Sequence, residues 1–208
     1  MIDISQKIQA STPAIKPTQI IADLDTIYKM ASDADPELRA LIARIAEDTN
    51  GQTQFPNGLK GMERALQKIN ADYKGDASRI TDITRGRIVY ETLDDLYSGL
   101  KTLHEEGVIA YFKDRFLKPA DSGYSDILTN VELSNTHIGE LRLELRQINE
   151  VASVEHLIYE QIRSIKAEVL IEGRDLTPQE TMIMDNLQIQ AQKLYHDAWQ
   201  KLIQNIKH

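Results

Sequence analysis

Residues 140–146 read ELRLELR, in which charged and apolar side chains alternate without interruption. Successive side chains of a β-strand point to opposite faces of its sheet, so this period of two predicts a strand with one leucine face and one charged face. The charged face has two readings. It is either a solvated surface held by cross-strand ion pairs, which the strand alone favours, or the floor of a site where carboxylates and arginines hold a metal ion and phosphates.

The segments around this strand predict the rest of the fold. Strands are expected at 83–90, 108–112 and 127–133, and helices from residue 18, from Asp35-Pro36, at 59–73, at 93–104 and after residue 149, with a break at 173–178. Residues 49–58 are polar and predict a loop. The order predicts an α+β fold: a small mixed, mostly antiparallel sheet of about four to five strands flanked by helices, with helical N- and C-terminal extensions.

Length and composition limit the class of protein. The 208 residues suit one compact unit, for which we expect an N-terminal helical extension at 1–57, a core at 58–170 and a C-terminal helical extension at 171–208. The net charge of −8 argues against a general nucleic-acid coat, and the absence of cysteine excludes disulfides and thiolate zinc sites. No apolar run is long enough for a bilayer span, so we expect a cytoplasmic protein without a membrane partner, or an effector delivered into a target cytosol.

Asp82 enters the strand predicted at 83–90, and Arg85 and Arg87 follow closely. Mg²⁺ prefers one or two carboxylates together with substrate phosphates, and Asp82 with Glu140 would supply that pair. The alternative is that Asp82 only caps the turn before the strand.

Lys60, Arg64 and Lys68 recur at intervals of four residues, which places three cations on one face of the predicted helix. Like charges stacked in this way repel each other unless an anion such as a triphosphate lies against them. A basic solvent-exposed helix explains the pattern equally well.

Lys113 begins a basic stretch that leads to Gly123 and Tyr124. Glycine allows a tight turn, and the tyrosine ring can then lie against a nucleobase. The alternative is a hairpin loop with a half-buried tyrosine.

In their order, these stretches resemble the synthetase domain of the RelA/SpoT family, whose members make alarmone nucleotides by moving pyrophosphate from ATP. DITRGR at 82–87 matches the family's Asp-Ile-x-Gly-x-Arg, KDRF at 113–116 its Lys/Arg-Asp-Tyr-Ile, and SGY at 122–124 its Asn-Gly-Tyr. ELRLE at 140–144 matches Glu-Ile-Gln-Ile-Arg, and Glu155-His156 matches a Glu-His pair on the next helix. The resemblance covers residues 60–159.

The resemblance implies an ATP- and Mg²⁺-dependent pyrophosphokinase in which Asp82 and Glu140 are catalytic and hold the Mg²⁺ ion. Glu140 would also accept the proton of the acceptor hydroxyl. We expect both carboxylates to face solvent, so that either can be removed without unfolding the protein. The implied ATP-binding residues are Lys60, Arg64, Lys68 and Arg87, and the implied acceptor-binding residues are Lys113, Tyr124 and Arg142.

The sequence departs from the family mainly on the acceptor side. Arg85 replaces a glycine, Ala120 a lysine, and Leu128 a histidine that would contact acceptor phosphates. Asp126 is expected to repel a nearby diphosphate. These changes predict a divergent, toxin-like enzyme that uses GDP and GTP poorly and takes another nucleotide or an RNA end as acceptor.

Two other functions fit the same residues. One is a nucleotidyltransferase that modifies RNA or protein, and the other is a catalytically inactive nucleotide-binding interaction module. A toxin would also have a cognate antitoxin or immunity protein. The sequence alone does not specify the acceptor or the oligomeric state.

Overall fold

The structure is a computed structural model that describes residues 2–206. In chain order the elements are α1 (Ile2–Ser11), α2 (Leu24–Asp48), β1 (Gln52–Gln54), α3 (Met62–Tyr73), the 3-10 helix η1 (Ala77–Arg79), β2 (Arg85–Tyr90), α4 (Leu93–Glu105), β3 (Ile109–Asp114), β4 (Ile127–Glu132), β5 (Ile138–Leu145), α5 (Arg146–Glu172) and α6 (Pro178–Ile206). Unit 1 consists of Met1–Leu117 and Asp126–Leu145, and unit 2 of Lys118–Ser125 and Arg146–His208.

Unit 1 is built on a five-stranded sheet with the order β1-β2-β5-β4-β3. β2 and β5 are parallel, whereas the pairs β1–β2, β4–β5 and β3–β4 are antiparallel. The predicted fold class, a small and mostly antiparallel mixed sheet with helices around it, is therefore confirmed.

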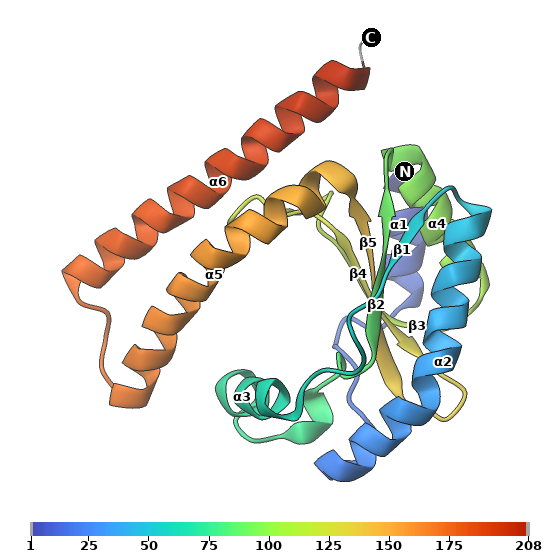
Figure 1. Ribbon diagram of the computed structural model, residues 1–208, viewed down its shortest axis with the longest axis horizontal. Helices are drawn as coiled ribbons and strands as arrows, with labels where there is room; N and C mark the ends of the chain where they lie inside the picture. Colours follow the sequence, from blue (N-terminus) through green and yellow to red (C-terminus); the bar gives the residue numbers. More distant parts are fainter. Residues whose placement is uncertain (1, 207–208) are drawn as a thin grey trace. The chain divides into compact units, whose positions relative to one another are not determined.

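The apolar face of the sheet packs against α2 and α4, which lie on the same side of it in Figure 1. The predicted leucine face of β5 points this way, and Leu141, Leu143 and Leu145 are fully buried. Gly86 lets α2 approach closely, because a Cβ atom there would lie 2.6 Å from the Ile42 side chain. The opposite face of the sheet is left for the charged side chains.

Helix α2 corrects two predictions. Residues 18–23 are not helical, and the helix runs from Leu24 to Asp48 through Pro36, where a new helix was expected to begin. A proline inside a helix removes one backbone hydrogen bond and costs about 3 kcal/mol or more. The helix continues because the residues on both sides of Pro36 bury apolar side chains on one face, including Ala31, Leu38 and Ile42.

Other boundaries differ by less. Residues 49–58 were predicted as a loop, but they contain the exposed edge strand β1, which pairs with β2 through Gln52–Gln54.

A second, smaller core joins the start of α2 to α3 and η1. Its buried members are Ile27, Ala31, Ala65, Ile69, Ala77, Ile80 and Ile83.

Unit 2 contains α5 and α6, which pack against each other, together with the loop 118–125. The predicted break between the helices lies at Gly173, which has a φ of 62°. Thr177 and Glu180 then form a reciprocal cap at the start of α6. The loop contacts α6 at Tyr195, whose ring lies 5.8 Å from that of Tyr124 in an edge-on arrangement.

Candidate active site

The charged face of the sheet gathers most of the predicted site residues of unit 1. Directly paired residues of neighbouring strands point to the same face, and the register pairs Arg85 with Glu140 and Arg87 with Arg142 across β2 and β5. Lys113 of β3 lies opposite Leu128 of β4, and Leu128 lies opposite Arg142. The face therefore carries cations from three strands, on the side of the sheet opposite α2 and α4.

Asp82 lies at the entry to β2, where two of the predicted ATP-binding lysines converge on it. Its Oδ2 atom accepts hydrogen bonds from the Nζ atoms of Lys60 at 3.0 Å and Lys68 at 2.9 Å. Burial alone raises the pKa of Asp82, but the two ammonium groups outweigh it and hold the pKa at about 2. Asp82 is therefore a carboxylate at neutral pH, inside a cluster with a net positive charge.

The expected face of three cations on one helix is only partly correct. Helix α3 begins at Met62, so Lys60 precedes it, and the Lys60 N–H donates to the Ile83 carbonyl at 2.9 Å. Arg64 lies on α3 but is exposed, and its guanidinium donates to Gln67 at 3.3 Å. The structure brings Lys60 and Lys68 together at Asp82, while Arg64 lies apart from them.

Glu140 and Asp82 are both buried, with exposed fractions of 4% and 6%, so the expectation that they face solvent is wrong. Glu140 accepts a hydrogen bond from the Arg142 Nε atom at 2.9 Å, and its own N–H donates to the Thr84 carbonyl at 3.2 Å. The backbone contact places Glu140 beside the residue that precedes β2, and Arg142 orients its carboxylate. Removing Asp82 leaves the partly buried Lys60 and Lys68 without the carboxylate that joins them, so a loss of stability must accompany any loss of activity in that variant.

Two further arginine contacts define the face. Arg87, predicted to bind ATP, donates to the buried Glu144 carboxylate at 3.0 Å and stays 42% exposed. Asp126 is fully buried and pairs with Arg115, and with Arg142 at 3.7 Å. The repulsion expected between Asp126 and an acceptor diphosphate is therefore opposed by two guanidinium groups.

The residues present fit a divalent cation. Asp82 Oδ1 and Asn130 Oδ1 are buried, and within residues 2–206 neither has a hydrogen-bond partner. Asn130 lies opposite Glu140 in the register and donates to Thr81, the neighbour of Asp82, at 3.2 Å. Unpaired oxygen atoms beside a second carboxylate are ligands that Mg²⁺ accepts. Among the described residues no group of three or more acidic, histidine or cysteine side chains could hold a metal ion, so substrate phosphates would have to complete the coordination.

Sequence reasoning missed Asn130. The signal available was an amide between Thr129 and Val131 in the predicted strand ILTNVE at 127–132. A buried amide in a strand needs partners, but the sequence does not show that its neighbours are Thr81 and Glu140.

Asp114, in the predicted Lys-Asp motif, has a structural role in unit 1. It points to the helical side of the sheet and accepts hydrogen bonds from Ser5 at 2.6 Å and Tyr97 at 2.8 Å. It also accepts from the Phe116 N–H at 2.8 Å, which shapes the turn after β3. This leaves Lys113, on the opposite face of the same strand, as the residue of the motif that can reach a ligand.

The remaining predicted residue, Tyr124, belongs to unit 2, as do Glu155 and His156. Tyr195 contacts Tyr124 and donates to the Glu155 carboxylate at 3.2 Å, while burial raises the pKa of Glu155. His156 is exposed on α5. The Glu-His pair therefore contributes one buried residue, which supports the packing beneath Tyr124.

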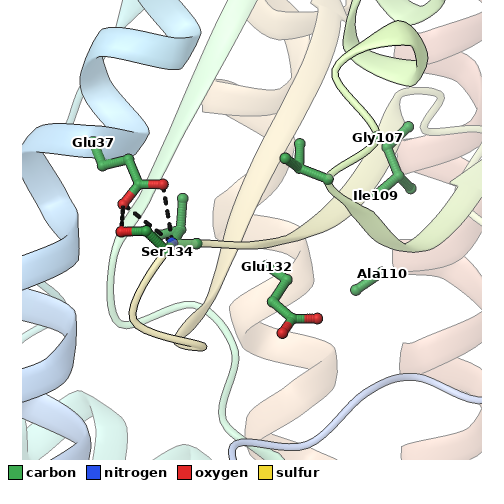
Figure 2. Close-up of a pocket in the computed structure, with 8 residues that line it drawn as sticks. Glu37, Gly107, Ile109, Ala110, Glu132 and Ser134 are labelled. Carbon is green, nitrogen blue, oxygen red and sulfur yellow. Dashed lines mark hydrogen bonds between the residues drawn. The ribbon is translucent and has the colours of Figure 1, made fainter.

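A hollow elsewhere in unit 1 has different chemistry (Figure 2). It lies at the start of β3 and the end of β4, where the Glu37 carboxylate accepts hydrogen bonds from the Ser134 N–H at 3.0 and 3.2 Å. Its charged residues are Glu37 and Glu132, both acidic. Such a lining would repel nucleotide phosphates, so the hollow does not compete with the Asp82 face as a phosphate site.

Comparison with solved structures identifies the class of fold. Small alarmone synthetase 2 from Bacillus subtilis aligns over 88% of this chain and 95% of its own, with a TM-score of 0.55 and 23% identity. Small alarmone synthetase 1 from Bacillus subtilis, bound to its product pppGpp, aligns over 87% and 92%, with a TM-score of 0.57 and 13% identity. The chain has the fold of the small, RelA/SpoT-type alarmone synthetases, as the sequence resemblance implied.

Within that class, one protein is similar to this chain both in structure and in sequence. The type VI effector Tas1, solved in complex with its immunity protein, aligns over 88% of this chain and all of that chain, with a TM-score of 0.65 and 23% identity. The (p)ppApp synthetase toxin Tas1 of Pseudomonas aeruginosa (strain UCBPP-PA14) is 37% identical over 67 residues, which are 32% of this chain. The match spans 15% of the length of that curated relative. No family model matches the chain.

Within residues 2–206, no helix combines the length and apolar character needed to cross a bilayer.

Proposed function

We propose that the protein is an ATP-dependent pyrophosphokinase that transfers pyrophosphate from ATP to a hydroxyl group of a nucleotide acceptor. The observation that supports this most directly is the convergence of Lys60 and Lys68 on the buried Asp82, beside Glu140. A cluster of this kind suits a triphosphate, since phosphoryl-transfer sites act mainly by positioning and charge neutralisation.

The proposed reaction joins the acceptor oxygen to the β-phosphorus of ATP and breaks the bond between that phosphorus and the oxygen bridging to the α-phosphate. AMP leaves with the bridging oxygen. Glu140 takes the proton of the acceptor hydroxyl, while Arg142 at 2.9 Å holds that carboxylate in place. Lys60 and Lys68 exchange part of their contact with Asp82 for the donor phosphates. Mg²⁺ held by Asp82 and Glu140 would neutralise charge on the phosphate oxygens.

The proposed acceptor is an adenine nucleotide. The name of the curated relative, a (p)ppApp synthetase, supports an adenine acceptor in that protein. In this chain, Leu128 on the charged face is buried and offers no hydrogen bond to acceptor phosphates. The same leucine favours a second candidate, the 3′ end of an RNA, which presents a hydroxyl without a terminal diphosphate.

Purified protein supplied with ATP and Mg²⁺ tests the proposal. AMP formation that requires ADP, ATP or RNA as acceptor, with a product heavier by one pyrophosphate, is the expected outcome. Release of free pyrophosphate would instead identify a nucleotidyltransferase, and ATP binding without turnover would identify a binding module. Efficient conversion of GDP would contradict the proposed acceptor.

We also propose that the protein inhibits growth and has a neutralising partner. The relative Tas1 is a toxin and was solved with its immunity protein. An enzyme that converts ATP to AMP in a target cytosol would lower the cell's energy supply. Expression of the wild-type chain should arrest growth, and Asp82→Asn should relieve the arrest at equal protein level. Growth at the wild-type rate in both cultures would contradict a toxic activity.

A further inference from the structure

The segment 12–23, which links α1 to α2, approaches the proposed site although sequence analysis assigned it no role. Part of it was predicted to be helical, but residues 12–23 lie outside the helices. Its one buried residue is Gln19, with an exposed fraction of 5%. A buried amide in a linker whose other residues are exposed or only partly buried indicates a specific attachment.

Gln19 is attached by hydrogen bonds at both ends of its amide. Nε2 donates to the carbonyl oxygens of Ile80 at 2.9 Å and Ile138 at 3.0 Å, and Oε1 accepts from the Ile138 N–H at 3.0 Å. The backbone N–H of Gln19 also donates to the Ser78 carbonyl at 2.7 Å. One side chain thus joins the segment before β2 to the start of β5.

These two backbone segments carry the two carboxylates of the site. Ile80 precedes Asp82 by two residues, and Ile138 precedes Glu140 by two residues on the same face of β5. Gln19 therefore fixes the separation of the chains from which Asp82 and Glu140 project. Its effect reaches the site through the backbone, since it does not contact either carboxylate by a hydrogen bond.

Lys16 lies three residues before Gln19 and is partly buried. Burial and repulsion by Lys68 lower the pKa of Lys16, while the charges of Glu140 and Asp82 act in the opposite direction. Because Gln19 holds this segment against the backbone at Ile80 and Ile138, Lys16 lies near the two chain segments that carry Asp82 and Glu140. It forms no ion pair with another described residue. Pro17 follows it, and a residue that precedes proline favours an extended backbone.

We propose that the segment 12–23 is a part of the nucleotide site, in which Gln19 is a positioning residue for Asp82 and Glu140 and Lys16 binds the phosphates of the donor nucleotide. The inference rests on the proposed function. Mg²⁺ tolerates little variation in the distance between its ligands, so a residue that fixes two carboxylates controls the affinity for the ion. A lysine supplies a compact charge suited to phosphate oxygens.

The Lys16 part is tested by binding of a non-hydrolysable ATP analogue in the presence of Mg²⁺. Lys16→Gln should weaken binding roughly tenfold by removing one charged contact with phosphate, and Lys16→Arg should restore most of it. Lys101→Gln is the matched control, because Lys101 on α4 is 67% exposed and undergoes the same change of charge. Equal affinities for wild type and Lys16→Gln would overturn this part.

The Gln19 part is tested by the Mg²⁺ concentration that gives half-maximal binding of the analogue. Gln19→Met keeps the volume but removes three hydrogen bonds, and should raise that concentration roughly tenfold. If Gln19→Met does not fold, Gln19→Asn replaces it in the test. The asparagine side chain is too short to reach both carbonyls and should raise the Mg²⁺ concentration by a smaller factor. Thr49→Val is the control for stability, because it removes the buried contact with the Tyr90 hydroxyl at 3.0 Å, at the other end of β2.

Loss of stability in Gln19→Met and Gln19→Asn with an unchanged Mg²⁺ requirement would show a purely structural residue and overturn the positioning role. The two hypotheses fail differently. If wild-type protein does not bind the analogue at all, the proposed function fails. If wild type binds it and the variants of Lys16 and Gln19 bind it equally well, only this inference fails.

Discussion

The donor side and the acceptor side of the proposed site are built differently. On the donor side, Asp82, Lys60 and Lys68 are joined by hydrogen bonds within unit 1, and the carboxylate is buried. On the acceptor side, Lys113 is exposed on β3, and Tyr124 belongs to unit 2, where it packs against Tyr195. The residues proposed to bind the donor are held in place by contacts within unit 1, whereas the residues proposed to bind the acceptor belong to two different units.

This difference indicates where change is tolerated. A buried cluster of charges fixes its members, because removing one leaves the others without compensation. Exposed or separately held residues can be replaced with less cost to the fold. The departure from the alarmone synthetases at Ala120 lies in the loop of unit 2, as this difference predicts, whereas the departure at Leu128 is buried in β4 of unit 1 and does not follow it.

The largest effect is expected at Asp82. Asp82→Asn preserves the shape but leaves Lys60 and Lys68 without a counter-charge and removes a ligand for Mg²⁺. Turnover of ATP per folded molecule should fall by roughly a hundredfold or more. Steady-state kinetics, with thermal unfolding as a check on folding, measures this. Asp94→Asn, at an exposed position on α4, is the control, and wild-type rates in Asp82→Asn would remove Asp82 from the mechanism.

The next effect separates the cations of the donor side. Lys68→Glu should weaken binding of the ATP analogue by roughly tenfold or more, with little change in the KM of the acceptor, because Lys68 lies directly on Asp82. Arg64→Glu changes charge on the same helix at an exposed position and should have a smaller effect. An equal loss of affinity for the ATP analogue in the two variants would show that Arg64 binds ATP as well, as the sequence predicted.

The acceptor side is tested at Tyr124. Stacking of an aromatic ring on a base contributes about 1–3 kcal/mol, so Tyr124→Ala should reduce turnover of the true acceptor about tenfold. Tyr124→Phe should retain most of the activity. The loss should appear in the KM of the acceptor and leave affinity for the ATP analogue unchanged. Tyr159→Ala, which removes a half-exposed ring of α5, is the control. Loss of ATP affinity in Tyr124→Ala would contradict the division into two sides.

The sequence predicted those features of the molecule that rest on local periodicity. The alternation at 140–146 predicted β5 and its two faces, and two of the residues predicted to bind ATP, Lys60 and Lys68, contact Asp82. The course of α2 through Pro36 could not be predicted, because the burial of Leu38 and Ile42 outweighs a local helix-breaking preference. Packing between elements that are distant in the chain is therefore hard to predict from a local stretch of sequence.

The same limit applies within the site. Gln19 and Asn130 look like ordinary polar residues in the sequence, and their positions beside the two carboxylates depend on contacts across 61 to 119 residues and 49 residues, respectively. The burial of Asp82 and Glu140 was also missed, since charged residues on an alternating strand usually face solvent. Contacts distant in sequence decided each of these features.

The smallest effect concerns how the two units respond to acid. His137, directly before the strand β5 that carries Glu140, is fully buried in unit 1, and neither ring nitrogen has a hydrogen-bond partner within residues 2–206. Burial lowers the pKa of His137 from 6.5 to about 4. The unfolded chain therefore binds a proton more readily than the folded chain. Above the pKa of His137 in the unfolded chain, the residue is neutral in both states and costs no stability. As the pH falls from that value toward the lower pKa in the folded chain, the unfolding free energy decreases.

Lowering the pH from 8 to 6 should therefore cost about 1 kcal/mol of unfolding free energy through this residue. His137→Leu should remove that part of the pH dependence, because leucine fills a similar apolar space without taking up a proton. His156→Leu is the matched control, since His156 is 60% exposed on α5 of unit 2. Urea unfolding at the two pH values measures the change, and hydrogen exchange locates it in β4 and β5 or elsewhere. The same pH dependence in wild type and His137→Leu would show that other groups of the chain sense the acid.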